Sequence, residues 1–278
     1  MSPRDASPGR RSRLAARVRS VVEAGKKGDR PAPLVEAGLL LLVLLFFSRV
    51  HAAAGQGVAD VATANAQALQ AVERALHLDV TLSANRWLVE HPALIRPAVY
   101  YYRLYYVVIV AVLVWVYLRR ADVYVRVRRA LVAMLLLVLP VFWLLPMAPP
   151  RLALPGVVDV IAENDIFGGP MTGHNMYSAM PSMHTAWSLW CAYAVWRGLR
   201  TTHPRPAWLP WLFPLGMMAV VLTTGNHYVL DIAGSVTLLL AAIAAASAWG
   251  RLAGRRRTRS STPPAVHRRP DESSLPQG

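Results

Sequence analysis

Six long stretches with almost no charge are the feature that most limits what this chain can fold into. They cover residues 34–50, 98–118, 130–150, 180–199, 208–226 and 228–249. A helix needs roughly 20 mainly apolar residues to cross a bilayer, within a range of about 17–25. The fourth stretch reaches that length only if its helix begins near Met180 and runs to Leu199. We therefore predict an all-α fold, a polytopic membrane protein built on a six-helix bundle.

The distribution of the net charge of +15 predicts how these helices are oriented. Four basic regions hold 24 of the 30 Lys and Arg residues, and they alternate with two regions that hold seven acids. The basic regions are residues 1–33, 119–129, 197–206 and 251–278, and the other two are residues 51–97 and 147–183. Because basic loops stay in the cytoplasm, we expect a multi-pass protein of the cell membrane with both termini cytoplasmic. Topology and contact with anionic lipids explain the basic excess, so we expect no nucleic-acid partner.

Composition also divides the chain into three parts. Residues 1–33 and 251–278 are rich in Arg, Ser and Pro, which favours disordered basic arms in the cytoplasm. The membrane domain is expected over residues 34–250. Its first apolar stretch follows a long polar segment and lacks a clear cleavage site, which favours a retained signal anchor over a cleaved signal peptide.

The two loops expected on the external side differ in their patterns. In residues 55–96, apolar residues such as Val61 and Val72 recur at helical spacing among polar ones. This predicts an amphipathic helix on the outer membrane face, either as a lid packed on the bundle or as a guide for lipid. Residues 147–183 are rich in Gly and Pro, which predicts an irregular loop that leads into His184.

The chain has a single cysteine, Cys191, within the fourth apolar stretch. One cysteine excludes a disulfide inside the chain and a zinc site built from cysteines. No group of Asp, Glu and His shows clear metal-ligand spacing either. We therefore expect chemistry that needs neither a metal nor another cofactor.

Two short motifs place ionisable residues at the edges of apolar stretches. Residues 179–184 read Ala-Met-Pro-Ser-Met-His, and residues 225–231 read Gly-Asn-His-Tyr-Val-Leu-Asp. Ionisable groups are costly at membrane depth, so they are candidates for function. His184 begins the fourth stretch, whereas His227 and Asp231 lie at the beginning of the sixth. The predicted topology puts both motifs at the extracytoplasmic face, where we expect these three residues to form one catalytic site.

The residue types and their spacing suit phosphoryl transfer. His227 and Asp231 are four residues apart, so they share one face of a helix. The carboxylate can then fix one ring nitrogen and leave the other as a nucleophile. His184 would supply a second imidazole that protonates the leaving oxygen, giving a double displacement without a metal.

Phosphoryl transfer also needs cations and hydrogen-bond donors around the phosphate oxygens. The candidates on the external side are Arg151, Arg103 and Ser182, together with the N–H groups that start the fourth helix. Arg103 has a second interpretation, because tyrosines flank it and it could reach the outer interface within an aromatic belt.

The second external loop carries further candidates. His174 and Asn175 either bind an acceptor or cap a turn. Three acids of the same loop are expected to be solvated, with binding of a polyol or cation as the alternative. They are Asp159, Glu163 and Asp165.

The two motifs resemble those of the phosphatidic acid phosphatase type 2 superfamily, in which Pro-Ser-x-His is followed by His-x-x-x-Asp. Here these patterns fall at residues 181–184 and 227–231. Three segments are similar to the branch of the superfamily that contains inositol phosphorylceramide synthases. They are Ala-Met-Pro-Ser-Met-His at 179–184, Ala-Pro-Pro-Arg at 148–151 and Asn-His-Tyr-x-x-Asp at 226–231. The resemblance covers residues 34–250.

The resemblance implies a role for each matching residue. His227 would be the nucleophile that forms a phosphohistidine, and Asp231 would orient it. His184 would be the acid for the leaving group, and Ser182 would contact the phosphate.

The chain also departs from the superfamily's pattern. Met183 stands where Gly is usual between Ser and His, and Val221 stands where Arg is expected six residues before the nucleophile. No Lys leads the first motif, although Arg151 would stand in for its arginine. Fewer cations suit a phosphodiester, which carries less charge than a monoester.

Three hypotheses about function follow. The first is a phosphotransferase that moves a phospho-headgroup, for which the resemblance suggests phosphoinositol, between lipids at the outer leaflet. Its partners would be a membrane lipid phosphate or phosphodiester and a lipid or alcohol acceptor. The second is a phosphatase that acts on phosphatidic acid or a polyprenyl phosphate with water as acceptor. The third is a non-catalytic scaffold or transporter, and the sequence leaves the oligomeric state open.

Overall fold

The computed structural model describes residues 31–164 and 175–260, in which the regular elements are helices joined by loops, with no strand among the described residues. This confirms the predicted all-α fold. The elements are α2 (Pro33–Ala54), α3 (Ala59–Ala75), α4 (Thr81–Val89), α5 (Pro92–Arg119), α6 (Ala121–Leu144), α7 (Pro150–Ala153), α8 (Val160–Glu163), α9 (Met183–Leu199), the 3-10 helix η2 (Pro206–Trp211), α10 (Leu212–Thr223) and α11 (Val229–Ser260). The predicted basic arms lie largely outside the described residues, although α11 continues beyond the domain boundary expected at residue 250.

Five helical segments among the described residues are long and apolar enough to cross a membrane, judged by length and composition. They are Pro33–Ala54, Pro92–Arg119, Ala121–Leu144, Pro206–Thr223 and Val229–Ala253. These segments confirm a polytopic membrane protein and match five of the six predicted stretches. Proline is the first residue of α2 and α5, where its fixed φ and missing N–H suit a helix start.

The fourth predicted stretch corresponds to α9, which has only 17 residues. The expected start near Met180 is wrong, because Ser182 has an extended backbone and its Oγ accepts the backbone N–H of Thr185. This N-cap makes Met183 the first helical residue. At about 17 residues a helix is at the lower limit for crossing a bilayer. Buried α9 side chains such as Trp190 pack within the same core as α6 and α11.

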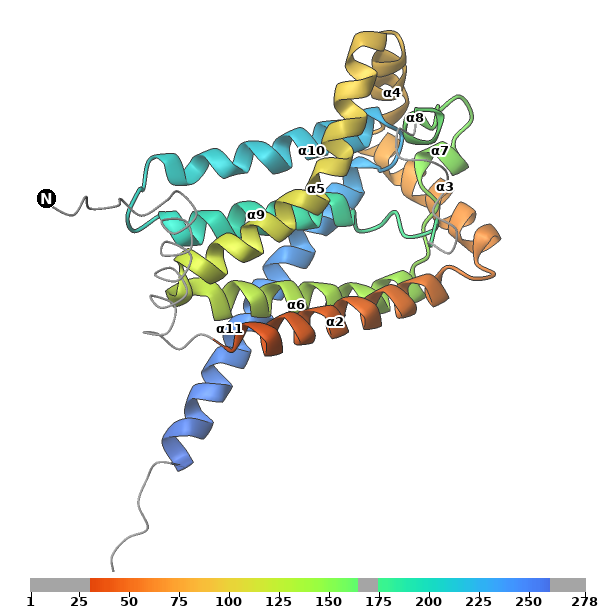
Figure 1. Cartoon of the computed structure of the whole chain (residues 1–278). Coiled ribbons are helices and arrows are strands. Elements are labelled where there is room, and N and C mark those ends of the chain that lie inside the picture. The colour runs from red at the N-terminus through yellow and green to blue at the C-terminus, as the bar shows by residue number, and fades with distance from the viewer. Residues whose placement is uncertain (1–30, 165–174, 261–278) are drawn as a thin grey trace, which may run out of the picture.

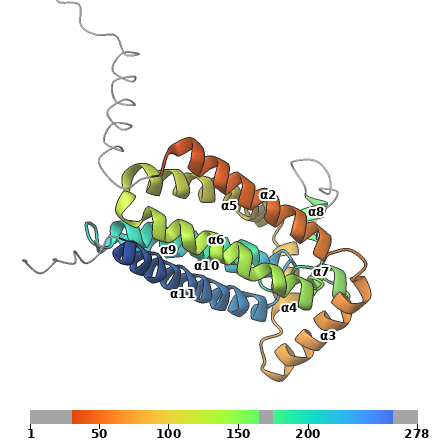
Figure 2. The same cartoon turned by 90° about the horizontal axis from the view of Figure 1, so that it is seen from below.

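The long helices form a bundle whose two ends differ. Figures 1 and 2 show α2, α6, α9 and α10 running alongside one another, with α5 and α11 crossing them obliquely in Figure 1, and α3, α4, α7 and α8 gathered at one end. The first turns of α9 and α11 lie at that same end, whereas α2 begins and α11 ends at the opposite one (Figure 1). The helices that carry the two histidine motifs therefore begin at the end of the bundle away from the start of α2 and the end of α11.

The core is centred on α6, which packs against α2, α9 and α11. Val127, Met134 and Phe142 on α6 are fully buried in it. Large apolar side chains also cover the outside of the bundle, as Leu42 of α2 (68% exposed) illustrates. Such a surface is costly in water and suits a hydrocarbon surround.

The predicted amphipathic helix corresponds to α3, and its two valines of the expected apolar stripe do not face the bundle. Val61 and Val72 are exposed, whereas Ala62, Ala66 and Glu73 are buried. Small residues allow α3 to approach α7 and α11 closely. The apolar stripe therefore points outward, as it would at a membrane surface, and the inward face carries a buried acid.

Candidate active site

The starts of α9 and α11 meet at the end of the bundle that carries the short helices (Figure 1). The ring centroids of His184 and His227 lie 6.0 Å apart. The backbone N–H of Ser182 donates to the carbonyl oxygen of Asp231 at 3.3 Å. Ser235 Oγ, one turn along α11, lies 2.8 Å from the carbonyl oxygens of both Ser182 and Asp231. Hydrogen bonds therefore hold together the two segments that carry the predicted catalytic residues.

The surroundings of His227 determine its tautomer. Its Nδ1 atom lies 2.9 Å from the carbonyl oxygen of Ala179 and 3.2 Å from Oδ2 of Asp231. Both neighbours accept hydrogen bonds, so Nδ1 must carry the proton. Nε2 then keeps its lone pair, which is the form required of a nucleophile.

Asp231 orients the imidazole and also helps to start its own helix. The side chain is fully buried, and Oδ2 also accepts the backbone N–H of Tyr228 at 2.9 Å. Asp231 is the third residue of α11, so this bond is one half of a capping box. The carboxylate is therefore fixed from two sides, by the first turn of α11 and by the His227 ring.

A tight turn delivers His227 to this position. Gly225 has a φ of 73°, a backbone conformation that glycine adopts without strain. A Cβ atom there would lie 2.6 Å from Val157 Cγ1, so the turn also needs the absence of a side chain. The backbone N–H groups of Asn226 and His227 both donate to the carbonyl oxygen of Val221, which closes the end of α10.

An aromatic wall from α5 positions His184. The ring of Tyr102 stacks on His184 with centroids 4.1 Å apart, and Tyr105 meets it edge-on at 4.6 Å. Tyr102 and Tyr105 are three residues apart and therefore share one helix face. The two tyrosines restrict the orientation of the imidazole near His227.

Arg151 reaches the same region from α7. Its Nη1 atom donates to Oδ1 of Asn226 at 2.6 Å, and its Nε atom lies 2.9 Å from Oδ2 of Asp159. Its backbone N–H donates to the carbonyl oxygen of Gly225. Arg151 is thus attached to the residue that precedes His227. Asp159 is paired with it rather than freely solvated, whereas Glu163 is exposed.

The other phosphate-binding candidates of the sequence lie close by. Arg103 directly follows Tyr102 on α5, and the ring of Tyr102 stacks on His184. Ser182 is fully buried, and its Oγ accepts the Thr185 N–H at 3.3 Å as the N-cap of α9. Accepting this bond does not use the Ser182 hydroxyl proton, which remains available for donation.

Of the two candidates for acceptor binding, only Asn175 is among the described residues, and its contacts are with other parts of the chain. His174 and Asp165 lie outside the described residues. The side-chain oxygen of Asn175 accepts the backbone N–H of Tyr177, and its side chain packs against Gly55 at the end of α2. These contacts give Asn175 a role in shaping the loop, which matches the turn-capping alternative.

Within the described ranges, no three His, Cys, Asp or Glu side chains are grouped as metal ligands.

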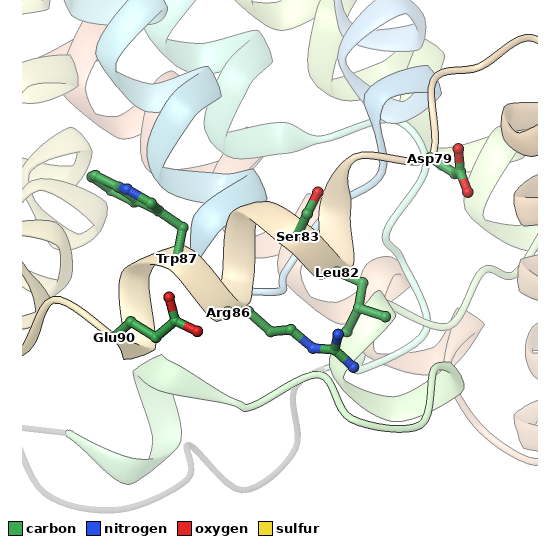
Figure 3. Close-up of a pocket in the computed structure, with 6 residues that line it drawn as sticks. All are labelled: Asp79, Leu82, Ser83, Arg86, Trp87 and Glu90. Carbon is green, nitrogen blue, oxygen red and sulfur yellow. The ribbon is translucent and has the colours of Figure 1, made fainter.

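A surface hollow lies apart from the two histidines. Figure 3 shows a hollow on the surface of α4, from which Arg86 and Trp87 point in different directions. The hollow is lined by Asp79, Leu82, Ser83, Arg86, Trp87 and Glu90. Neither His184 nor His227 lines it.

Sequence reasoning missed some of the supporting residues. Tyr102 and Tyr105 were expected only as members of an aromatic belt around Arg103. Their i, i+3 spacing places both tyrosines on one face of the helix that carries Arg103, and this spacing could have indicated a shared contact. Ser235 lies four residues after Asp231 on the same helix face, but its bond to Ser182 joins distant segments and leaves no local signal.

Comparison with known families matches the chain to one superfamily. A model of the PAP2 superfamily matches residues 67–245, a range that includes His184, His227 and Asp231. No curated protein and no solved structure gives a significant match to the chain.

Proposed function

Because this chain belongs to the PAP2 superfamily, we propose that it is a membrane phosphotransferase that works through a phosphohistidine on His227. The superfamily includes lipid phosphatases and phosphotransferases. The enzyme would move a phospho-headgroup, with phosphoinositol favoured by the motif resemblance, from one lipid to another at the external leaflet. The observation that carries the proposal is the pair of acceptors around Nδ1 of His227, which leaves Nε2 ready to attack.

In the first half of the proposed reaction, Nε2 of His227 attacks the phosphorus of the donor lipid. A P–N bond forms while the bond between phosphorus and the leaving oxygen breaks. His184 donates a proton to that oxygen, so the leaving group departs as a neutral alcohol. Asp231 stabilises the positive charge that develops on the His227 ring.

In the second half, the hydroxyl of the acceptor lipid attacks the phosphohistidine. His184, now lacking its proton, removes the proton of the hydroxyl as the new P–O bond forms. The P–N bond breaks and returns His227 to its starting state. Arg151 and Arg103 would stabilise the charge on the phosphate oxygens throughout.

The environment of Val221 supports a phosphodiester donor. This position, where the superfamily pattern has an arginine, is fully buried in an apolar cluster with Val99 and Met217. A buried valine cannot supply a positive charge. Having one cation fewer suits a donor that carries less charge than a phosphate monoester.

The second candidate, a lipid phosphate phosphatase, shares the first half of this reaction. Water would replace the acceptor lipid in the second half and release inorganic phosphate. The observation in its favour is Arg151, whose guanidinium group contacts the residue before His227, since a monoester needs positive charge around its oxygens.

The test uses protein purified in detergent together with phosphatidylinositol, phosphatidic acid or a polyprenyl phosphate. Each lipid is offered with and without a lipid that carries a free hydroxyl. Mass spectrometry follows headgroup transfer, and a phosphate assay follows hydrolysis. The variants are His227→Ala and, as a control, His203→Ala, which changes an exposed histidine outside the site.

Headgroup transfer that requires His227 would support the phosphotransferase. Phosphate release that requires His227 without any transfer would replace it with the phosphatase. Equal activity of His227→Ala and the parent protein would contradict both and favour a non-catalytic role.

A further inference from the structure

Glu73 is a buried acid that the proposed reaction does not use. It lies on the inward face of α3 and is only 1% exposed. Burying a carboxyl group is costly unless it forms hydrogen bonds. Here Oε1 of Glu73 accepts the backbone N–H of Leu230 at 2.7 Å.

This hydrogen bond is made to the first turn of α11, the helix that carries Asp231. Leu230 is the second residue of α11, and the first N–H groups of a helix lack partners within it. The residue before α11 is Tyr228, which is not one of the side chains that cap helices. By contrast, α9 is capped by its own preceding residue, Ser182. Asp231 accepts the N–H of Tyr228 from within α11, whereas Glu73 supplies from another helix the acceptor for Leu230 that Tyr228 cannot provide.

The surroundings of Glu73 act in opposite directions on the pKa of its carboxyl group. Burial raises the pKa of the Glu73 carboxyl, and the nearby Asp231 acts in the same direction, whereas the bond from Leu230 opposes both. The N-terminus of a helix favours a negative charge or an acceptor. Glu73 and Asp231 thus flank the same turn, one from α3 and one from within α11.

We propose that Glu73 is a positioning residue, which caps α11 from α3 and so fixes Asp231 against His227. The role in turnover rests on the function proposed above. Asp231 follows Leu230 directly, and its Oδ2 already lies 3.2 Å from Nδ1 of His227. Movement of the first turn would lengthen this contact, and small misplacements of catalytic groups are costly in rate.

The test compares Glu73→Ala, which removes the acceptor, with Glu73→Gln, which keeps an oxygen at the same distance. Asp60→Asn is the matched control, because Asp60 is an exposed acid on the same helix. We expect Glu73→Ala to lower kcat by about 10-fold with little change in KM. Glu73→Gln should restore most of the lost kcat, and Asp60→Asn should behave like the parent protein.

An unchanged kcat in Glu73→Ala would overturn the proposal. A loss that Glu73→Gln does not rescue would overturn it too, because capping needs an acceptor rather than a charge. If Glu73→Ala does not fold, Glu73→Asp takes its place. The shorter side chain should fail to reach Leu230 and should lower kcat, and an Asp variant with the parent's kcat would contradict the capping role.

Hydrogen exchange separates this proposal from the proposed function. The amides of the first turn of α11 should exchange faster in Glu73→Ala than in the parent protein or in Asp60→Asn. Equal exchange would overturn the capping role even if no lipid substrate were found. The other outcome is faster exchange in Glu73→Ala together with a parent protein that shows no turnover dependent on His227. That result would support the capping role and reject the proposed function.

Discussion

Nε of Arg151 lies 2.9 Å from Oδ2 of Asp159, so a cation beside the candidate nucleophile already has an anionic partner. The same guanidinium group donates to Asn226, the residue before His227. A phosphate that binds Arg151 would have to compete with the Asp159 carboxylate. We therefore expect Asp159 to weaken the binding of a phosphate at Arg151.

Replacing this acid should strengthen binding of anionic lipid. Asp159→Asn removes the charge and keeps an oxygen that can accept the N–H of Ala162, as Asp159 now does. We expect KM to fall by about threefold, because a partly exposed ion pair contributes little energy. Initial rates over a series of lipid concentrations measure this, with the exposed Glu163→Gln as control. An increase in KM would mean that Asp159 holds Arg151 in its productive position.

The contact between Asp231 and His227 should matter mainly for the rate of reaction. Asp231→Asn keeps the size of the side chain but removes the charge that holds the Nδ1–H tautomer. We expect kcat to fall by about 10³-fold with a smaller change in KM. The control is Asp122→Asn, an exposed acid that pairs with Arg120 instead. Parent-like kcat in Asp231→Asn would remove Asp231 from the proposed mechanism.

The proposed role of His184 can be separated from simple loss of structure by changing the leaving group. His184→Gln should lower kcat on a lipid phosphodiester by about 10²-fold or more, because an alcohol leaves poorly without a proton. The same variant should lose much less activity on a p-nitrophenyl phosphodiester, whose phenolate needs no proton. Equal losses on both substrates would show that His184 does not act as the acid. Thermal unfolding of the variant checks that it remains folded.

Removal of divalent metal should leave activity unchanged. The two imidazoles supply the nucleophile and the acid, and the arginines supply positive charge, so the proposed reaction has no step for a metal to perform. Turnover is measured before and after dialysis against EDTA. Loss of activity that added Mg²⁺ or Zn²⁺ restores would contradict the mechanism.

The parts of the fold that follow from local sequence could be predicted. A run of apolar residues is a local property, so five of the membrane segments are found where the sequence puts them. The alternation of such segments also indicates that the helices bearing His184 and His227 start at the same end of the bundle. The start of α9 was placed too early because apolar length alone does not reveal a cap. The signal was Ser182, whose side chain binds the third residue of the helix.

The supporting contacts of the candidate site could not be predicted in the same way. Glu73 and Leu230 are 157 positions apart, and no local pattern links them. The spacing of Val61 and Val72 predicts an apolar stripe correctly, yet hydrophobicity alone does not say whether the stripe faces the bundle or the surroundings. In water it would face inward, but here it is exposed and the acid is buried. A membrane removes the cost that makes an exposed apolar face unfavourable.

Ser235 gives a prediction about how the two histidine-bearing helices are held together. Its Oγ lies 2.8 Å from the carbonyl oxygens of Asp231 on its own helix and Ser182 before α9. Ser235→Ala should remove the side-chain link between the two helix starts and lower kcat by about fivefold, since a neutral hydrogen bond contributes about 1 kcal/mol. Ser247→Ala is the matched control, because Ser247 also bonds one turn back on α11, to Ile243. If the two variants have the same kcat, the bond to Ser182 contributes nothing to the proposed reaction. A loss confined to Ser235→Ala would instead mean that the spacing of His184 and His227 depends on this link.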